Sequence, residues 1–305
     1  MVSMVLKPMF LYLSKNKVLN RSAKRWGLKM GAKQVVAGVT IADAMRTVQE
    51  LNDKGLVATV DHLGEFITSR QEAIESTNDC IETLKAITKT GVNCNLSLKL
   101  TQLGLDVERE LCYQNMRKIV RTAYELENFV RIDMEDSSHC QQTLDLLADL
   151  REEFPNSVGT VIQAYLHRAK ADVNDLQGIN LRLVKGAYKE SSEIAFQEKK
   201  VIDDNYFEII KQHLLSGSYT AIASHDHTII DKVKAFCEEE GIPKTQFEFQ
   251  MLYGFRKELQ EEIAKEGYTM RVYVPFGTDW YGYFMRRLAE RPQNVSFAIR
   301  GLLSK

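Results

Sequence analysis

The sequence has few cysteines, and their spacing argues against two common roles. Its five cysteines are scattered along 305 residues, at Cys80, Cys94, Cys112, Cys140 and Cys237, and no two form a CxxC pair. A zinc ribbon or a disulfide framework needs closely spaced, paired cysteines, so neither is expected. Scattered thiols are typical of a protein from a reducing cytoplasm.

The chain also lacks an excess of charge of either sign. Its 40 Lys and Arg residues nearly balance 41 Asp and Glu residues, for a formal net charge of −1. No overall field and no basic block would attract a polyanion. We therefore expect no nucleic-acid partner.

Long hydrophobic runs are absent as well. A membrane-spanning helix needs about 18 or more consecutive apolar residues, and no segment of the sequence approaches that length. The apolar stretch Met1–Leu13 is interrupted by Lys7 and Pro8 and has no clear cleavage site, so it is not a signal peptide. We expect a soluble, cytoplasmic protein in which this stretch either packs on the fold or docks peripherally at the inner face of the membrane.

What the sequence does contain is a regular alternation of strand-like and helix-like segments. Apolar runs rich in β-branched residues predict eight strands. They are Val57–Val60, Val92–Leu98, Phe129–Met134, Val158–Tyr165, Ile179–Val184, Tyr219–Ser224, Phe247–Leu252 and Met270–Val274. Eight strand–helix units favour an α/β fold of the (β/α)8 TIM-barrel type. A doubly wound sheet is disfavoured because no GxGxxG follows the first strand.

Segments with helical periodicity and charge separate these runs. The predicted helices are Glu65–Thr88, Glu108–Leu126, Ser138–Glu153, Ala169–Leu176, Ile194–Leu215, Thr228–Glu240 and Lys257–Lys265. Residues 1–50 precede the first strand and are predicted to form helices, including Thr40–Leu51, that pack on the barrel. We therefore expect an N-terminal helical segment, 1–50, and a catalytic barrel domain, 51–305.

Polar side chains gather where the predicted strands end. The active site of a barrel lies at the carboxyl ends of its strands, and charged or amide groups within apolar strands are costly unless they are paired or liganded. Such residues occur in all eight strand segments: Asp61, His62 and Glu65; Lys99; Arg131, Asp133, Glu135 and Asp136; Gln163; Arg182 and Lys185; Ser224, His225, Asp226 and His227; Glu248 and Gln250; Arg271 and Tyr273. This concentration predicts a ligand site.

Two other interpretations apply to individual members of this set. Arg182 and Lys185 could be structural partners of the carboxylates that follow the third strand. His225 and His227 would share one face of an extended strand, as metal ligands do, but no carboxylate–lysine arrangement completes a binuclear site. We expect no metal.

Near the C-terminus, four functional side chains fall on one side of a helix. Tyr283 and Arg287 are four residues apart, as are Arg286 and Glu290, so an aromatic ring, two guanidinium groups and a carboxylate share one patch. The patch suits a small ligand with a carboxylate at one end and an apolar ring behind it. A solvated helix face with an Arg–Glu pair is the structural alternative.

Four motifs, in this order, resemble those of the proline dehydrogenase family, specifically its monofunctional bacterial form. They are RLVKGAY at Arg182–Tyr188, FEFQMLYG at Phe247–Gly254, RVYVPFG at Arg271–Gly277 and YxxRRxxE at Tyr283–Glu290. The resemblance runs from about Asp61 to Glu290. It implies a distorted (β/α)8 barrel in which FAD lies across the strand carboxyl ends and the last helix covers the site.

The resemblance also implies the reaction and its partners. L-Proline would be oxidised to Δ1-pyrroline-5-carboxylate, the first step of proline degradation to glutamate, with electrons passing from FAD to a membrane quinone. Pyrroline-5-carboxylate dehydrogenase would be the partner that takes the product.

Roles for individual residues follow from the same resemblance. Lys99, Arg286 and Arg287 would bind the proline carboxylate, and Tyr188 and Tyr283 would pack on its ring. Tyr273 would crowd the ring, with Asp133 as its hydrogen-bonding neighbour, and Glu65 would pair with Arg286 to close the site. Glu290 completes the substrate patch. The implied FAD contacts are Gln163, Arg182, Lys185, Gly186, Ala187, Ser224 and His225, together with Met134 and Gln250.

Two other functions use the same residues. A barrel lyase would form a Schiff base at Lys99 or Lys185 and bind a carboxylate at the arginine pair, but it leaves Gln163, Arg182 and His225 without a role. A non-catalytic sensor would bind flavin or proline without oxidation. Both stand as alternatives to the dehydrogenase.

Overall fold

Eight parallel strands close into a barrel in which they follow one another in chain order. The computed structural model describes residues 34–64 and 67–290, and only the backbone of 287–290. The strands are β1 (Val57–His62), β2 (Cys94–Leu98), β3 (Val130–Ile132), β4 (Val158–Gln163), β5 (Leu181–Val184), β6 (Thr220–Ala223), β7 (Phe247–Leu252) and β8 (Thr269–Phe276). β8 closes on β1, with Tyr273 opposite Thr59. The predicted (β/α)8 barrel is confirmed.

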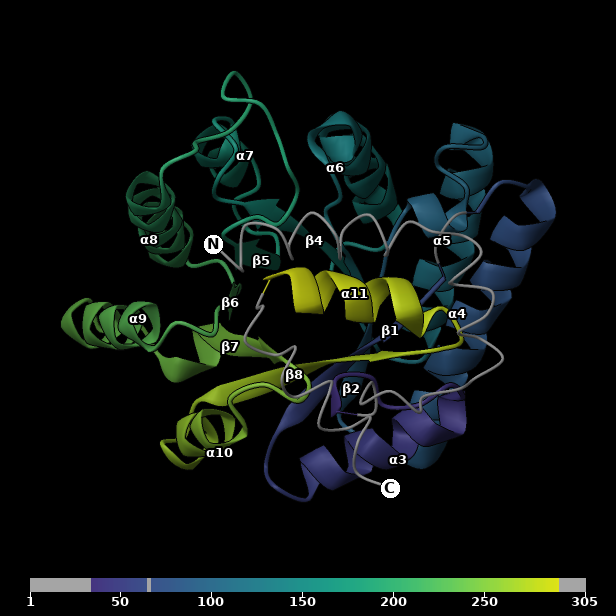
Figure 1. The fold of residues 1–305 in the computed structure, drawn as a ribbon, viewed down its shortest axis with the longest axis horizontal. Coiled ribbons are helices and arrows are strands. Elements are labelled where there is room, and N and C mark those ends of the chain that lie inside the picture. Colours follow the sequence, from purple (N-terminus) through teal and green to yellow (C-terminus); the bar gives the residue numbers. More distant parts are fainter. Residues whose placement is uncertain (1–33, 65–66, 291–305) are drawn as a thin grey trace.

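Helices surround the barrel, as Figure 1 shows. They are α3 (Ile41–Asn52), α4 (Arg70–Thr90), α5 (Arg109–Glu125), α6 (Ser137–Glu153), α7 (Ala169–Asp175), α8 (Lys199–Leu215), α9 (His227–Glu239), α10 (Lys257–Lys265) and α11 (Trp280–Glu290), with short 3-10 turns η2 (Thr101–Leu103) and η3 (Lys244–Gln246). In Figure 1, α11 crosses in front of the strands near the middle of the ring. Because it follows the end of β8 directly, it lies at the carboxyl end of the barrel.

Two helices start later than their periodicity predicts. α4 begins at Arg70, not Glu65, because Ser69 and Glu72 form a capping box: each side chain accepts a hydrogen bond from the other residue's backbone. α8 begins at Lys199, not Ile194, because the chain before it pairs with the end of β4. Ala195 bridges Leu166, and the Phe196 N–H donates to the Tyr165 carbonyl.

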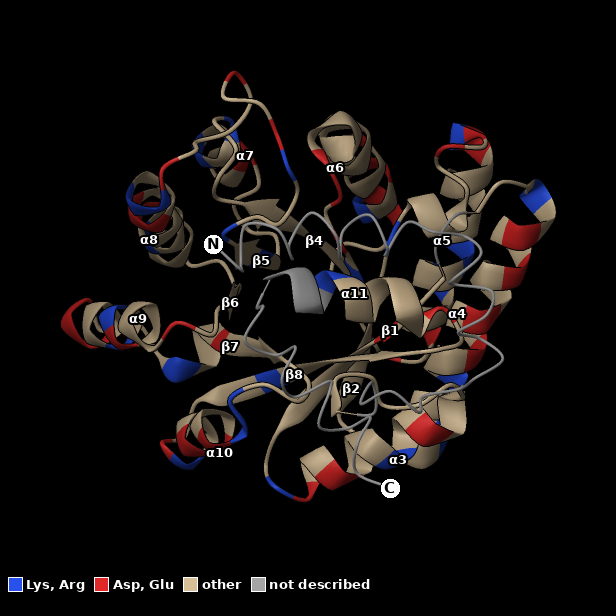
Figure 2. Ribbon diagram, in the orientation of Figure 1, with Lys and Arg blue, Asp and Glu red and all other residues tan. Residues whose placement is uncertain are grey.

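The apolar core lies between the strands and the helices. Alternate strand residues belong to it, for example Ala58 and Val60 in β1 and Val272 and Val274 in β8. The residues between them, such as Thr59, Asp61 and Tyr273, point into the barrel, whose interior is therefore polar. The period of two follows from strand geometry. In Figure 2, Lys, Arg, Asp and Glu mark the helices densely and the strands sparsely.

The N-terminal segment is described only from residue 34. α3 has a capping box formed by Thr40 and Asp43 and packs against β1 and β8. Residues 1–33, including Met1–Leu13, lie outside the described part, so the division at residue 50 stays a prediction. None of the helices among the described residues is long and apolar enough to cross a membrane.

Candidate active site

Three oxygen-bearing side chains from three strands meet at the carboxyl end of the barrel. The Tyr273 hydroxyl lies 2.6 Å from Oδ2 of Asp61 and 2.7 Å from Oδ2 of Asp133. Burial, and then the two carboxylates, hold the pKa of Tyr273 well above its usual value. The phenol therefore stays protonated and donates to a carboxylate, and the two contacts fix the position of its hydroxyl.

Lys99 joins this group from the end of β2. Its Nζ lies 3.0 Å from Oδ2 of Asp61 and 3.7 Å from Oδ2 of Asp133. Burial alone would lower the pKa of Lys99, but the two carboxylates outweigh burial and raise it. The ammonium is thus permanently charged, and its side chain is still 22% exposed, so it can accept a further anionic partner.

Arg182 supplies a second cation from β5, opposite Lys99. Its Nη1 donates to Oδ1 of Asp133 at 2.6 Å and to the Ser97 hydroxyl at 3.2 Å. Its guanidinium carbon lies 5.3 Å from the centre of the Tyr273 ring, a cation–π arrangement. Although burial raises the pKa of Asp133, Arg182 and Lys99 outweigh it and lower the pKa below the ordinary value. Asp133 is therefore ionised and connects both cations.

Tyr188 and α11 bring further candidates to the same mouth. Desolvation of the Tyr188 hydroxyl raises its pKa to about 12, although the residue as a whole is 40% exposed, and the charges of Lys99, Glu135 and Arg286 act on that hydroxyl. Tyr188 and Arg286 are therefore within electrostatic reach of each other and of Lys99. Tyr283 is buried on α11. The side chains of Arg287 and Glu290, and Glu65 entirely, lie outside the described residues, and their roles stay predictions.

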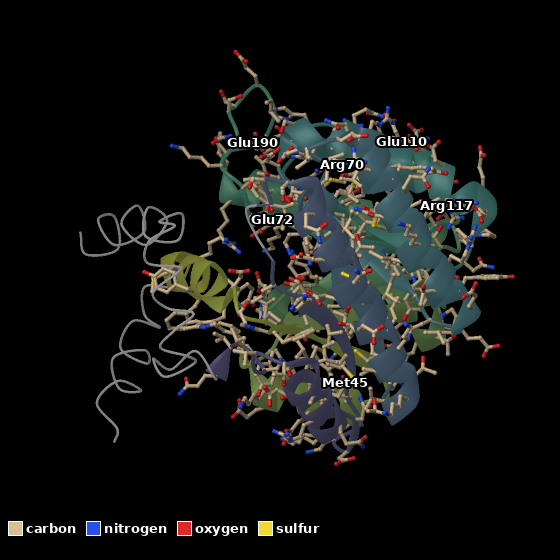
Figure 3. All side chains as sticks on the ribbon, turned by 90° about the vertical axis from the view of Figure 1, so that its right-hand side faces the viewer. Met45, Arg70, Glu72, Glu110, Arg117 and Glu190 are labelled. Atoms are coloured by element: carbon tan, nitrogen blue, oxygen red, sulfur yellow. The ribbon has the colours of Figure 1, made fainter. Side chains whose placement is uncertain are left out.

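Carboxylates tie the loops around this mouth together. Glu135 accepts hydrogen bonds from the backbone N–H and the hydroxyl of Thr101. Glu190, in the loop that carries Tyr188, accepts from the backbone N–H and the hydroxyl of Ser137, both at 2.8 Å. Glu190 thereby caps the N-terminus of α6. In Figure 3, Glu190 lies near the top of the view, on the same side of the molecule as Arg70 and Glu110.

The residues expected to hold FAD lie along β4, β5 and β6 at the same end. Gln163 is buried and donates to the Glu135 carbonyl, and Met134 packs in a small apolar cluster with Tyr165. Lys185 is half-buried and paired with Asp203 and Asp226. Ala187 is exposed in the loop after β5.

The donors available here fit a group with many carbonyl and phosphate oxygens. His225 Nε2 accepts from the Leu252 N–H at 3.0 Å, so a neutral ring carries its hydrogen on Nδ1, as a donor. Ser224 accepts from the Asp226 N–H and can still donate its own hydroxyl hydrogen. Arg182 and Lys185 add positive charge. The donor set therefore fits FAD, whose contacts with these residues stay predictions.

The fold requires a glycine at position 186, apart from the contact with FAD expected there. Its φ is +121°, and a Cβ there would lie 2.2 Å from Cδ1 of Tyr165. Any side chain would strain the backbone and collide with that ring. The glycine thus lets the loop after β5 pack against Tyr165, whether or not a ligand also approaches it.

His225 and His227 do not act as a pair. His225 uses Nε2 to accept from the backbone of β7, and His227 is exposed at the start of α9. Among the described residues, no group of three or more His, Cys, Asp and Glu side chains is arranged to hold a metal ion.

Three of the polar strand residues are not at the carboxyl end, and for them the prediction is wrong. Glu248 pairs with Arg271, and Arg131 donates to the carbonyls of Thr160 and Asn180. All lie toward the amino end of the barrel and satisfy one another or the backbone. Their spacing in sequence resembles that of the site residues, because every second strand residue faces inward at both ends.

Asp61 was expected among the polar strand-end residues, but the sequence indicated no individual role for it. It is 1% exposed, yet it contacts both Lys99 and Tyr273, and the motifs above do not include it. Its position at the end of the first strand was the available signal. Asp61 gives the mouth a second carboxylate beside Lys99.

Comparison with known proteins identifies relatives along nearly the whole chain. The family model described as proline dehydrogenase matches residues 44–300. Proline dehydrogenase 2 of Bacillus subtilis (strain 168) is 50% identical over 304 residues, 99% of this chain and 100% of that protein. Proline dehydrogenase of Deinococcus radiodurans is 42% identical over 287 residues, 92% of this chain and 91% of its own.

A solved structure shares the fold. The crystal structure of proline utilization A from Bdellovibrio bacteriovorus, inactivated by N-propargylglycine, matches with a TM-score of 0.81 and 28% sequence identity. The match covers 89% of this chain and 34% of that longer protein, so this chain corresponds to about a third of it. With the family model spanning the barrel and α11, the chain belongs to the proline dehydrogenase family.

Proposed function

We propose that this protein oxidises L-proline to Δ1-pyrroline-5-carboxylate with FAD as its cofactor, and that the electrons pass on to a membrane quinone. The observation that carries the proposal is the position of Lys99. A positively charged, partly exposed ammonium shares Oδ2 of Asp61 with the Tyr273 hydroxyl, and its charge and that of Arg286 both act on Tyr188. Family membership supplies the reaction class.

The substrate would be held at its carboxylate. Lys99, Arg286 and Arg287 offer three cations, and a hydrogen bond to a charged group contributes about 1.5–3 kcal/mol. Tyr188 and Tyr283 would pack on the ring of proline, with Glu65 and Glu290 pairing with the arginines. Tyr273, immobilised between Asp61 and Asp133, would limit the ring's size and exclude a hydroxylated proline by crowding.

Charge at the mouth would also assist hydride removal from the carbon next to the ring nitrogen. FAD, when bound, accepts that hydride. The residues that would hold FAD are Gln163, Lys185, Gly186, Ala187, Ser224, His225 and Met134. Arg182, fixed on Asp133, places a guanidinium where negative charge increases during the reaction.

The lyase alternative conflicts with the raised pKa of Lys99 and with the ion pairs of Lys185. A Schiff base forms from a neutral amine, whereas the carboxylates of Asp61 and Asp133 raise the pKa of Lys99. Lys185 is held in ion pairs with Asp203 and Asp226. Neither lysine is therefore prepared for nucleophilic attack.

The remaining parts of the proposal concern the cellular setting. A cytoplasmic protein that delivers electrons to a membrane quinone must meet the membrane surface, and Met1–Leu13 would provide peripheral contact at its inner face. Pyrroline-5-carboxylate dehydrogenase would consume the product. Sedimentation with vesicles, compared for the full chain and for Leu6→Glu, tests the membrane contact, which is contradicted if both sediment equally.

The first experiment is an anaerobic visible spectrum of the purified protein before and after addition of L-proline. We expect flavin bands that bleach with L-proline but not with trans-4-hydroxyproline. Flavin that stays oxidised would favour the sensor, or another substrate. A protein that holds no flavin even after FAD is supplied would overturn the proposal and reopen the lyase, which borohydride trapping with a keto acid would then test.

A further inference from the structure

Gln250, in β7, connects Arg182 to a second buried charge. Its Oε1 accepts from Arg182 Nε at 2.6 Å, and its Nε2 donates to Oε1 of Glu248. The side chain is 3% exposed. The orientation of the amide is determined by its neighbours, since a guanidinium only donates hydrogen bonds and a carboxylate only accepts them. A flipped amide would oppose like groups on both sides.

Glu248 is a rigid anchor for this amide. Arg271 Nε donates to its Oε1 at 2.8 Å, and the Tyr219 hydroxyl donates to its Oε2 at 2.9 Å. Arg271 is held in turn by the Ala58 carbonyl. Each carboxylate oxygen of Glu248 thus has a partner. Neither Glu248 nor Arg271 can rotate without breaking one of these hydrogen bonds.

Arg182 needs a second support to keep its orientation. The Asp133 carboxylate and the Ser97 hydroxyl both engage the same nitrogen, Nη1. A planar guanidinium held at one nitrogen can still pivot about that contact, and the Tyr273 ring, 5.3 Å from its carbon, offers no directional hydrogen bond to prevent this. A bond at Nε, on another edge of the plane, removes this freedom. Gln250 accepts that bond and so fixes the plane of Arg182.

We propose that Gln250 is a positioning residue that acts through Arg182: anchored on Glu248, it holds the guanidinium plane toward the ring of the bound flavin. The proposal rests on the function proposed above, because it assumes that FAD binds beside Arg182. It replaces the direct FAD contact expected of Gln250. Loss of Gln250 should weaken the preference of the site for the reduced, more negative cofactor without removing the cofactor.

The test compares Gln250→Met with a matched control, Gln260→Met. Methionine keeps the length of the side chain and removes both amide bonds. Gln260 on α10 is as buried, at 2% exposed, but its amide donates to the carbonyls of Phe255 and of Leu252, the last residue of β7, and to neither Arg182 nor Glu248. Each protein is loaded with FAD, and the flavin midpoint potential is measured with a chemical reductant and a reference dye, so that proline is not needed.

We expect Gln250→Met to lower the ratio of affinities for reduced and oxidised flavin about tenfold, a shift of about −30 mV for a two-electron couple. The kcat for proline should fall by a similar factor with little change in KM. Gln260→Met should match the wild type in both. An unshifted potential in Gln250→Met would overturn the inference, while the proposed function would stand if proline still bleached the flavin. A wild-type protein that holds no FAD would remove the proposed function itself.

A double-mutant cycle separates action through Arg182 from a general loss of structure. Lysine at position 182 cannot offer a bond at Nε, so in the Arg182→Lys background the Gln250→Met change should shift the potential no further. Additive shifts would contradict the proposal. Gln250→Asn serves if Gln250→Met does not fold: it keeps an amide near Glu248 but is too short to span both partners, and the same shift is expected.

Discussion

The two ends of the barrel interior are built from the same residue types but are satisfied in different ways. At the amino end, Glu248, Arg271 and Arg131 use hydrogen bonds to one another, to Tyr219 and to backbone carbonyls. At the carboxyl end, Asp61, Lys99, Asp133 and Arg182 are also paired. There, however, the Lys99 side chain remains 22% exposed, against 14% for Arg271 and 2% for Glu248 at the amino end.

This difference separates charges that only satisfy one another from charges that can also bind a ligand. A closed set of buried ions contributes little net stability, but removal of one member leaves its partner uncompensated. A set of charges that is still partly exposed can bind a further charged group. We therefore expect changes at the amino end to act mainly on stability and changes at the carboxyl end mainly on catalysis.

The largest effect on stability should follow from breaking the Glu248–Arg271 pair at the amino end of the barrel. Glu248→Leu leaves the half-buried Arg271 without its carboxylate, and we expect the free energy of unfolding to fall by about 3–5 kcal/mol. Urea denaturation of the flavin-free protein measures it. The double variant Glu248→Leu with Arg271→Met should recover most of the loss, because no buried charge is left unpaired. A loss below about 1 kcal/mol in the single variant would mean that the amino end is not closed.

At the carboxyl end of the barrel, Asp133→Asn should lower activity more than it lowers stability. The isosteric amide cannot neutralise Arg182 or Lys99, so we expect kcat/KM for proline to fall about a hundredfold. Steady-state kinetics and a denaturation curve are compared for each protein. Asp136→Asn, three residues further on, is the control, since asparagine caps a helix as well as aspartate and Asp136 caps α6. Equal activity in the two variants would contradict the comparison.

The sequence predicts the fold better than it predicts which end of the barrel a charge belongs to. Strand alternation is a local property, so all eight strands and the helices between them could be identified. Arg131 and Asp133 are two residues apart and face the same way, yet only Asp133 contacts Lys99 and Arg182. Which of them reaches the mouth depends on the stagger of neighbouring strands, and no local pattern encodes that stagger.

Contacts between distant loops were equally out of reach. Glu190 and Ser137 are 53 residues apart, and nothing near either residue indicates the other. The start of α4 was also predicted wrongly, at Glu65, but there the signal was local: Ser69 and Glu72 are a capping-box signature that sequence alone contains.

A smaller effect, on the free energy of unfolding, should appear when the pH is lowered. His213 on α8 is buried beside Thr220, and burial, with a contribution from the charge of Arg131, lowers its pKa to about 4 from 6.5. The folded protein therefore keeps this ring neutral, while the unfolded chain binds a proton below pH 6.5. Stability from this group is present above pH 6.5 and is lost as the pH falls toward 4, by about 2 kcal/mol at pH 5.

The difference between wild type and His213→Gln isolates this contribution. His139, held between Asp106 and Asp136, has a raised pKa and acts with the opposite sign, losing its contribution as the pH rises. Because it is present in both proteins, it cancels. A pH-independent difference in unfolding free energy between pH 5 and pH 8 would show that His213 is not held neutral.

The smallest effect should come from loosening one loop at the open end. Glu190→Ala removes both hydrogen bonds to Ser137, which join the loop carrying Tyr188 to α6. Losing about 1 kcal/mol of ordering should raise KM for proline about fivefold and leave kcat within about twofold, because the cations and Arg182 are untouched. Glu193→Ala, exposed in the same loop, is the control and should match the wild type. If kcat fell instead while KM stayed constant, the loop would position the groups that react and would not contribute to substrate binding. The carboxyl end of the barrel would then be more rigid than its exposure indicates.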